Sequence, residues 1–223
     1  MSPLVVTAHL VRGYSARDPW SPALEGILAY ALMRERLSPD DFAAQAAQPT
    51  QLAPVEGLPL ERVTFEDAWW WACSSPSSPD PVGNYGRERR HFHRRFDDQH
   101  ERHLVDGVRT VMTAAGPYKS ARLSDVRVLC RALRWSVVGE AGEIARLLDG
   151  VIQVGRRRGV GYGEVSRWEV SLAGEAEAEA ARWRRPVPAA AAAARGLSGP
   201  TMPWGLTPPS YAPACQALCV MPT

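Results

Sequence analysis

The densest concentration of groups that could bind phosphate is the segment GRRRGVGYG at residues 155–163. Glycines let peptide N–H groups approach phosphates closely, and arginines bind phosphates through paired hydrogen bonds. The segment therefore predicts a phosphate-contacting loop, with a hairpin turn carrying solvated arginines as the alternative. Its glycines are Gly155, Gly159, Gly161 and Gly163, and its arginines are Arg156, Arg157 and Arg158.

Nucleotide hydrolysis is disfavoured at this glycine-rich loop. A Walker-type loop requires a Gly-Lys-Ser/Thr triplet followed by a helix. This loop has no such triplet, and the next residues, EVSRWEVSL at 164–172, are typical of a strand. Dinucleotide binding is disfavoured for the same reason.

A second basic segment, Arg87–His103 (RERRHFHRRFDDQHERH), holds six arginines and four of the chain's five histidines. It has too few apolar residues to form a core, so we expect a protruding hairpin or arm with a return segment that reaches residues 116–119. Aromatic and imidazole rings among arginines suit stacking on splayed RNA bases. A solvated loop with internal salt bridges is the alternative. The candidate RNA-binding residues are Arg89, Arg90, His91, Phe92, His93, Arg94 and Arg95, with Lys119 on the return segment.

The histidines of this arm raise two chemical alternatives. His91 and His93 would lie on one face of a strand, where imidazoles can act as base and acid on a 2′-OH and a leaving oxygen, helped by Tyr118 or Lys119. A metal-independent ribonuclease is therefore an open alternative. No metal site is expected from the arm, because no ordered cysteine or carboxylate partner is evident.

Composition limits the class of protein. The 223 residues, 45% of them hydrophobic, suffice for a sizeable core, and the net charge is only +2. Lys119 is the only lysine among 26 basic residues, and arginine is the better residue for phosphate contacts and base stacking. No apolar run approaches the roughly 20 residues needed to cross a bilayer, so no membrane role is expected. The four cysteines are Cys73, Cys130, Cys215 and Cys219.

Those cysteines show neither a CxxC pair nor zinc-site spacing. Because no signal peptide is evident, we expect reduced, mostly buried thiols in a cytoplasmic protein. No cofactor is expected.

Hydrophobic patterning predicts an α+β domain. Apolar residues recur at helical spacing in 23–37, where Ser21-Pro22 is a plausible cap, and β-rich runs flank this helix. The order strand, helix, strands, strand, helix, strand is that of a ferredoxin-like (RRM-like) βαββαβ fold. The expected strands are 4–10, 58–63, 67–73, 126–138, 151–154 and 164–172; the expected helices are 23–37, a short one within 38–57, and 140–148.

Three consecutive tryptophans, Trp69, Trp70 and Trp71, cannot all face one side of a strand. At least one must therefore meet solvent, RNA or another subunit. Residues 174–198 are low in complexity and are expected to form a helix or linker. Residues 199–223 are rich in proline but also apolar, so we expect them to pack back on the core.

Four stretches of the chain are similar to a known family. VIQVGRRRGVGYGEVSRWEV, at 151–170, resembles the glycine-rich loop and last core strand of the RAMP superfamily of CRISPR-associated proteins. LEGILAYAL at 24–32, GPYKSARL at 116–123 and MPWG…PP…LCVMP between 202 and 222 resemble, in the same order, the crRNA 5′-handle-binding subunit of type IV effector complexes.

The resemblance implies a ferredoxin-like core at 1–173 with an inserted β-hairpin thumb at about 76–118, which the arm matches by position only. It also implies partners: crRNA, the backbone RAMP subunits, the large subunit, and target nucleic acid through the complex. By the family pattern, the residues contacting RNA would be Gly155, Arg156, Arg157, Arg158, Gly159, Gly161, Tyr162 and Gly163.

The expected function is non-catalytic binding of the crRNA 5′ handle, which caps the filament of backbone subunits. A crRNA-processing endoribonuclease is the first alternative. A protein scaffold, in which the tryptophans and the C-terminal segment serve assembly while neighbours hold the RNA, is the second.

Overall fold

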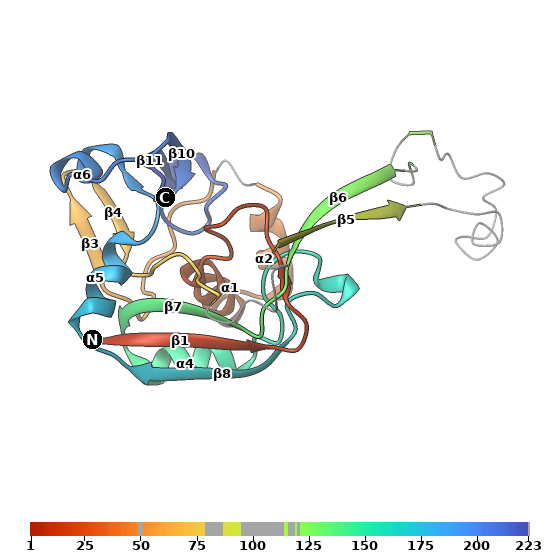
Figure 1. Cartoon of the computed structure of the whole chain (residues 1–223), viewed down its shortest axis with the longest axis horizontal. Coiled ribbons are helices and arrows are strands. Elements are labelled where there is room, and N and C mark those ends of the chain that lie inside the picture. The colour runs from red at the N-terminus through yellow and green to blue at the C-terminus, as the bar shows by residue number, and fades with distance from the viewer. Residues whose placement is uncertain (49–50, 79–86, 95–113, 116–118, 120, 223) are drawn as a thin grey trace.

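The computed structural model describes residues 1–48, 51–78, 87–94, 114–115, 119 and 121–222. The described residues form an α+β structure, as expected from the sequence: a body of helices and antiparallel sheets from which one hairpin projects (Figure 1). Within them, no helix is long and apolar enough to cross a membrane.

The main sheet has β1 (Ser2–Leu10) at its centre. Strands β7 (Ala132–Gly139) and β8 (Val165–Leu172) pair with β1 on either side, both antiparallel. The expected strand at 151–154 is wrong: this segment forms only an isolated bridge from Gln153 to Glu164. Its backbone instead closes the glycine-rich loop.

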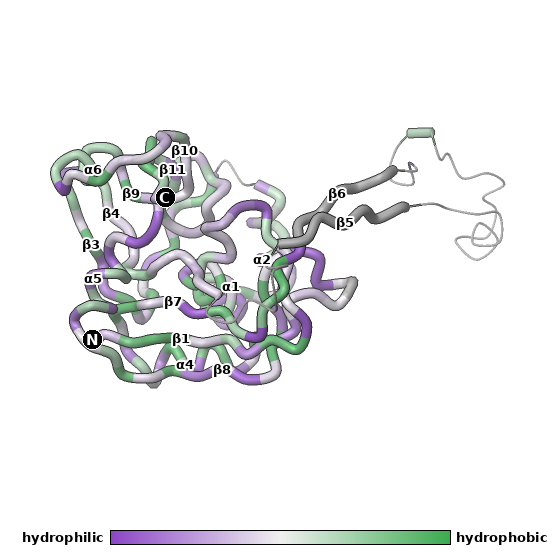
Figure 2. Tube along the Cα trace, in the orientation of Figure 1, coloured by the Kyte–Doolittle hydropathy of each residue, from purple (hydrophilic) through white to green (hydrophobic). Residues whose placement is uncertain are grey.

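One face of the main sheet carries the core. Side chains alternate between the faces of a strand, so the even-numbered residues of β1 point the same way, and Leu4, Val6 and Ala8 are fully buried. Helices α1 (Leu24–Arg36) and α4 (Ala141–Asp149) cover this face with their apolar stripes. Figure 2 shows hydrophobic segments along these elements inside the body.

The start of α1 differs from expectation. Its N-cap is Ala23, which makes no side-chain capping bond, so Ser21-Pro22 precedes the helix and does not cap it. A short helix, α2 (Pro39–Ala46), follows within the expected 38–57 segment and is capped by Ser38, whose Oγ accepts a hydrogen bond from Asp41 N.

Residues 72–77 run along the outer edge of β7. Ser74 N donates to Ser136 O at 2.9 Å, and Ser77 N donates to Arg134 O at 2.9 Å. The hairpin of β3 (Arg62–Phe65) and β4 (Ala68–Trp71) precedes this segment. The main sheet is thus extended beyond β7 by irregular pairing.

The projecting hairpin consists of β5 (Arg87–Arg94) and β6 (Ala121–Val128), antiparallel from Arg87↔Val128 to Arg94↔Ala121. At its base, the two-residue strand β2 (Tyr14–Ser15) pairs with the end of β6. The β-prone run at 126–138 is therefore two strands belonging to different sheets, β6 and β7, with the chain turning at 129–131.

The C-terminal segment, residues 174–222, folds beside the β3–β4 hairpin. Its sheet has the order β10-β11-β9, and Ala191 and Ala192 are fully buried against Trp70. Residues 174–198 thus hold two helices and a short strand. The elements are α5 (Glu175–Trp183), β9 (Val187–Pro188), α6 (Ala189–Ala194), β10 (Thr201–Gly205) and β11 (Gln216–Val220).

The three tryptophans of β4 divide between two cores. Trp71 is 5% exposed in the main core, whereas Trp70 is fully buried in the C-terminal cluster, where its Nε1 donates to Arg182 O. Only Trp69 is partly exposed, with the Arg62 guanidinium 4.0 Å above its ring. Both faces of this strand are covered because the C-terminal segment packs on the side opposite the main core.

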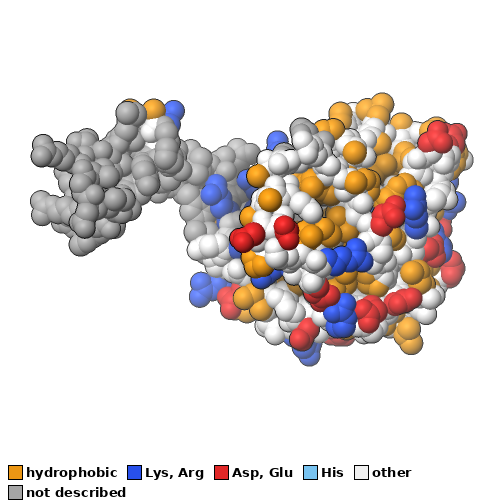
Figure 3. All heavy atoms as spheres, turned by 180° about the vertical axis from the view of Figure 1, so that it is seen from behind, with side chains coloured by type: hydrophobic (Ala, Val, Ile, Leu, Met, Phe, Trp, Pro, Cys, Tyr) orange, Lys and Arg blue, Asp and Glu red, His pale blue; other side chains and the backbone are white. Residues whose placement is uncertain are grey.

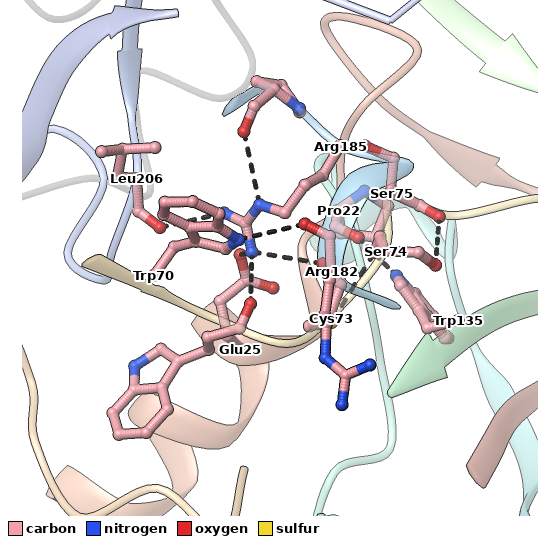
Figure 4. Close-up of polar contacts among 12 residues, drawn as sticks. Pro22, Glu25, Trp70, Cys73, Ser74, Ser75, Trp135, Arg182, Arg185 and Leu206 are labelled. Carbon is pink, nitrogen blue, oxygen red and sulfur yellow. Dashed lines mark hydrogen bonds and ion pairs between the residues drawn. The ribbon is translucent and has the colours of Figure 1, made fainter. Parts of the chain in front are cut away.

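Arg185 joins these two cores. Its guanidinium is 3% exposed, forms an ion pair of 3.0 Å with the buried Glu25 of α1, and donates to the carbonyl oxygens of Trp71, Cys73 and Leu206 (Figure 4). A buried charge is tolerated only when it is paired and hydrogen-bonded. This network fixes the start of α1 against the C-terminal segment.

Candidate functional site

The glycine-rich loop is anchored at both ends by its backbone. Val154 N donates to Gly163 O at 2.8 Å, and Gly163 N donates to Gly13 O at 2.9 Å. Arg156 N donates to Ser15 O at 2.8 Å, which ties the loop to β2. Because β2 pairs with the end of β6, the loop lies at the base of the projecting hairpin. In Figure 1 this loop lies on the hairpin side of the body, and Figure 2 colours much of it hydrophilic.

Two of the loop glycines serve this close packing. Both Gly155 (φ +76°) and Gly163 (φ +71°) have left-handed backbones. A Cβ on Gly155 would lie 2.7 Å from Ser15 O, and a Cβ on Gly163 would lie 1.7 Å from Val154 O. Side chains cannot occupy these positions, so the two residues fix the shape of the loop.

The other two glycines face open space. A Cβ on Gly159 or Gly161 would meet nothing within 4 Å. Gly161 has a left-handed φ of +84°, whereas Gly159 does not have a positive φ. Gly159 lies within a 3-10 turn, Arg158–Val160, which is closed by Gly161 N donating to Arg158 O. This outer part of the loop leaves the backbone accessible to a ligand.

The three arginines of the loop differ in exposure. Arg156 and Arg158 are exposed, and Arg157 is half-buried with a left-handed φ of +57°. Left-handed backbone in a non-glycine residue is uncommon and costs about 1 kcal/mol or more. Consecutive residues with alternating backbone handedness can form concavities that bind anions. Two exposed guanidinium groups beside such a turn suit phosphate.

Tyr162 does not extend toward solvent. Its ring is only 8% exposed, and the Arg127 guanidinium from the end of β6 lies 5.2 Å from the ring centroid. The tyrosine therefore packs the loop against the hairpin base and has little surface to offer a base for stacking.

A cavity of about 360 Å³ opens between the loop, the residues after β2 and the start of α1. Its wall carries three arginines, Arg17, Arg156 and Arg158, and also the aromatic ring of Tyr30. Sequence reasoning did not find Arg17 or Tyr30. Arg17 stands in the turn-rich segment after the first strand, and Tyr30 lies on α1 outside its buried stripe, so neither carried a local signal of its own.

The arm residues are placed only in part. Arg89, Arg90, His91, Phe92, His93 and Arg94 belong to β5, of which the structure describes the backbone; Arg95 lies outside the described residues. Lys119 is exposed. The pairing of β6 with β2, and of Ser15 with Arg156, brings the hairpin base to the glycine-rich loop.

A separate polar cluster lies on the opposite face of the main sheet. His9 Nε2 is 3.0 Å from Glu169 Oε2 and 3.0 Å from an Arg167 guanidinium nitrogen. The hydrogen bond from His9, and then the Arg167 charge, lower the pKa of the Glu169 carboxyl below its ordinary value. This cluster is internally paired and is not joined to the glycine-rich loop.

The view from behind shows basic and acidic side chains interspersed over the described part of the body, so no patch of a single sign covers the described surface on that side (Figure 3). A net charge of +2 is consistent with this distribution.

Comparison with known proteins identifies the family. No curated protein matches the chain. The family described as CRISPR type IV associated protein Csf3 matches residues 2–201, which run from the start of β1 to the start of β10 and include the glycine-rich loop. This match confirms the resemblance to type IV CRISPR-associated proteins that the sequence stretches indicated. The chain belongs to the Csf3 family of CRISPR type IV associated proteins.

Proposed function

We propose that this protein binds the 5′ handle of the crRNA and caps the backbone filament of a type IV CRISPR ribonucleoprotein. Family membership makes the chain a component of a type IV complex that includes other Cas subunits. The observation that carries the RNA-binding proposal is the anchored glycine-rich loop. Its Arg156 and Arg158 line one cavity together with Arg17, and its turn glycines Gly159 and Gly161 have open space beside them.

A ferredoxin-like RAMP core is the fold that we propose for this role. In such a fold the first strand lies between the third and the fourth, and the second strand flanks the third. The order β8-β1-β7, with residues 72–77 along the outer edge of β7, supports this arrangement. Helix α1 connects β1 toward 72–77, and α4 connects β7 to β8, as the βαββαβ order requires.

The chemistry of the loop favours a nucleic-acid backbone over a protein surface. Arg17, Arg156 and Arg158 line the cavity, and no acidic residue of the described chain lines it with them. Three guanidinium groups on the wall of one cavity suit phosphate oxygens. We therefore propose RNA 5′-end binding without cleavage as the activity.

Binding measured at several salt concentrations tests the proposal. The purified protein is titrated with a labelled single-stranded 8-nucleotide RNA, and the Arg156→Ala/Arg157→Ala/Arg158→Ala triple variant is compared with wild type. We expect weaker binding and a salt slope lower by about one unit for each phosphate that the variant no longer neutralises.

A matched control removes the same charge elsewhere on the body. Arg62, Arg146 and Arg195 are about half exposed, with side-chain exposures of 46%, 49% and 44%, and none lines the loop cavity. Their triple alanine variant should bind RNA nearly as wild type does. Absence of RNA binding by the wild type at low salt, or equally weakened binding by both triple variants, would contradict the proposal. Cleavage of the RNA would favour the endoribonuclease alternative.

A further inference from the structure

A second, larger cavity adjoins the arginine-bearing one. Its volume is about 920 Å³, and it lies between α1, α2, the segment 51–56 and the C-terminal segment 204–211. Aromatic rings are prominent among its walls. They come from Tyr30, Phe42, Trp204 and Tyr211, of which Tyr30 is 41% and Tyr211 57% exposed.

Tyr30 connects the two cavities. It lines both of them, as do Ser21, Ala23 and Gly26 at the start of α1. A flexible ligand held at the glycine-rich loop therefore needs only to pass this tyrosine to enter the larger cavity. The Tyr30 side chain is partly exposed, and the Arg34 guanidinium lies 5.9 Å from the centroid of its ring.

The two cavities differ in charge. Three arginines line the smaller one, whereas the charged residues of the described chain that line the larger one are Arg36 and two carboxylates, Glu25 and Glu56. Arg36 is already engaged, since its guanidinium donates to Glu56 O at 3.2 Å. Glu25 is neutralised by Arg185, so the charges at the larger cavity nearly balance. A phosphate is therefore favoured in the smaller cavity, whereas an uncharged aromatic group suits the larger one.

Tyr30 stands on a rigid support. Its ring meets the ring of Phe42 edge to face, with centroids 5.6 Å apart. One turn earlier on α1, Glu25 is locked to Arg185, and Leu28 is fully buried in the core. A ring held in place loses little conformational freedom on binding, which favours stacking with an incoming planar group.

We propose that the larger cavity receives one unstacked nucleobase of the RNA whose phosphates contact the glycine-rich loop, and that this base stacks on Tyr30. This assignment presupposes the RNA-binding role proposed above and adds to it a base subsite. A nucleotide joins a negative phosphate to a neutral aromatic ring, which is the combination that the two adjoining cavities separate. A peptide segment fits the aromatic walls but gives no reason for the arginines next to them.

The test pairs a tyrosine variant with an RNA lacking a base. A set of 8-nucleotide RNAs carries a single abasic residue at successive positions, and affinities are measured by fluorescence anisotropy for wild type, Tyr30→Ala and Tyr30→Phe. Tyr30→Ala should weaken binding of the intact RNA about 5- to 150-fold, the range of stacking on one aromatic ring. Tyr30→Phe, which keeps the ring, should recover most of this affinity.

One abasic position should weaken binding to wild type by a similar factor and have no further effect in Tyr30→Ala. The salt slope of Tyr30→Ala should equal that of wild type, because the variant keeps every phosphate-binding group. If Tyr30→Ala binds all RNAs as wild type does while the loop arginine variant fails, the base subsite is wrong and the proposed function stands. If the wild type binds no RNA, the proposed function itself fails. If Tyr30→Ala binds RNA as wild type does but no longer assembles into the type IV complex, the larger cavity holds a protein segment, and this result would overturn the assignment.

Discussion

Replacing the loop glycines by alanine, one at a time, separates the shape of the loop from its contact with a ligand. Gly163→Ala places a methyl group 1.7 Å from Val154 O and also requires a left-handed alanine. Gly161→Ala requires only the left-handed backbone, since the space around it is open. Gly159→Ala meets neither obstacle and adds only a methyl group on the open side.

The three costs can be worked out separately. A left-handed alanine costs about 1 kcal/mol, and forcing a backbone apart to relieve an overlap costs about 1–3 kcal/mol. Gly163→Ala should therefore lower the free energy of unfolding by about 2–4 kcal/mol, and Gly161→Ala by about 1 kcal/mol. Gly159→Ala should change it by less than about 1 kcal/mol, or raise it slightly, because alanine restricts the unfolded chain.

Urea unfolding followed by tryptophan fluorescence measures these differences, and RNA titration of the same proteins measures the ligand effect. Gly159→Ala should weaken RNA binding several-fold although its stability is unchanged, because the methyl group occupies the space through which a phosphate reaches the backbone. Equal stabilities of Gly159→Ala and Gly163→Ala would refute the packing argument. Undiminished RNA binding by Gly159→Ala would refute the close approach of a phosphate to the backbone at this turn.

Two further predictions concern the buried groups that join the cores. Arg185→Met should lower the free energy of unfolding by about 3–5 kcal/mol, because it leaves the Glu25 charge unpaired, and adding Glu25→Gln should restore part of this stability. The control Arg195→Met removes an arginine that is about half exposed and should cost less than about 1 kcal/mol. Urea titration of the variants measures these differences. Burial raises the pKa of the Cys219 thiol to about 11, against about 8.5 in an unfolded chain. Below about pH 8 the thiol is neutral in both states, but between about pH 8.5 and 11 only the unfolded chain ionises, so stability should fall with rising pH. Thermal melts of Cys219→Ala should show a slope shallower than that of wild type by about 1.4 kcal/mol per pH unit, and identical slopes would contradict the assignment.

The sequence predicts the main sheet and its two covering helices well, because their signals are local. In β1 the alternation of buried and less buried residues follows the strand period, and the leucines at 24, 28 and 32 follow the helix period. The ends of these elements are less well predicted. Ser21-Pro22 has the composition of a helix start, but α1 begins at Leu24, which is fully buried in the core.

Pairing between distant segments could not be read from local pattern. The run at 126–138 is uniformly β-prone, yet its first part pairs with β5 in the hairpin and its second part with β1 in the main sheet. Trp70 and Trp71 are both buried because Ala191 and Ala192, more than a hundred residues later, cover one of the two faces. An alanine run gives no sign in the sequence that it will form such a contact.

The candidate site illustrates the same division between local and long-range information. The glycine and arginine content of 155–163 marks the loop, but its position depends on Ser15, a residue in a strand too short to predict. Ser15 joins the loop through the bond of its carbonyl oxygen to Arg156 N, and it also pairs with Arg127 at the base of the hairpin. The loop and the basic hairpin therefore share one anchoring residue. An RNA bound at the loop would start beside the hairpin, and the two arginine-rich segments, separated by more than fifty residues in the chain, could contact consecutive stretches of one strand.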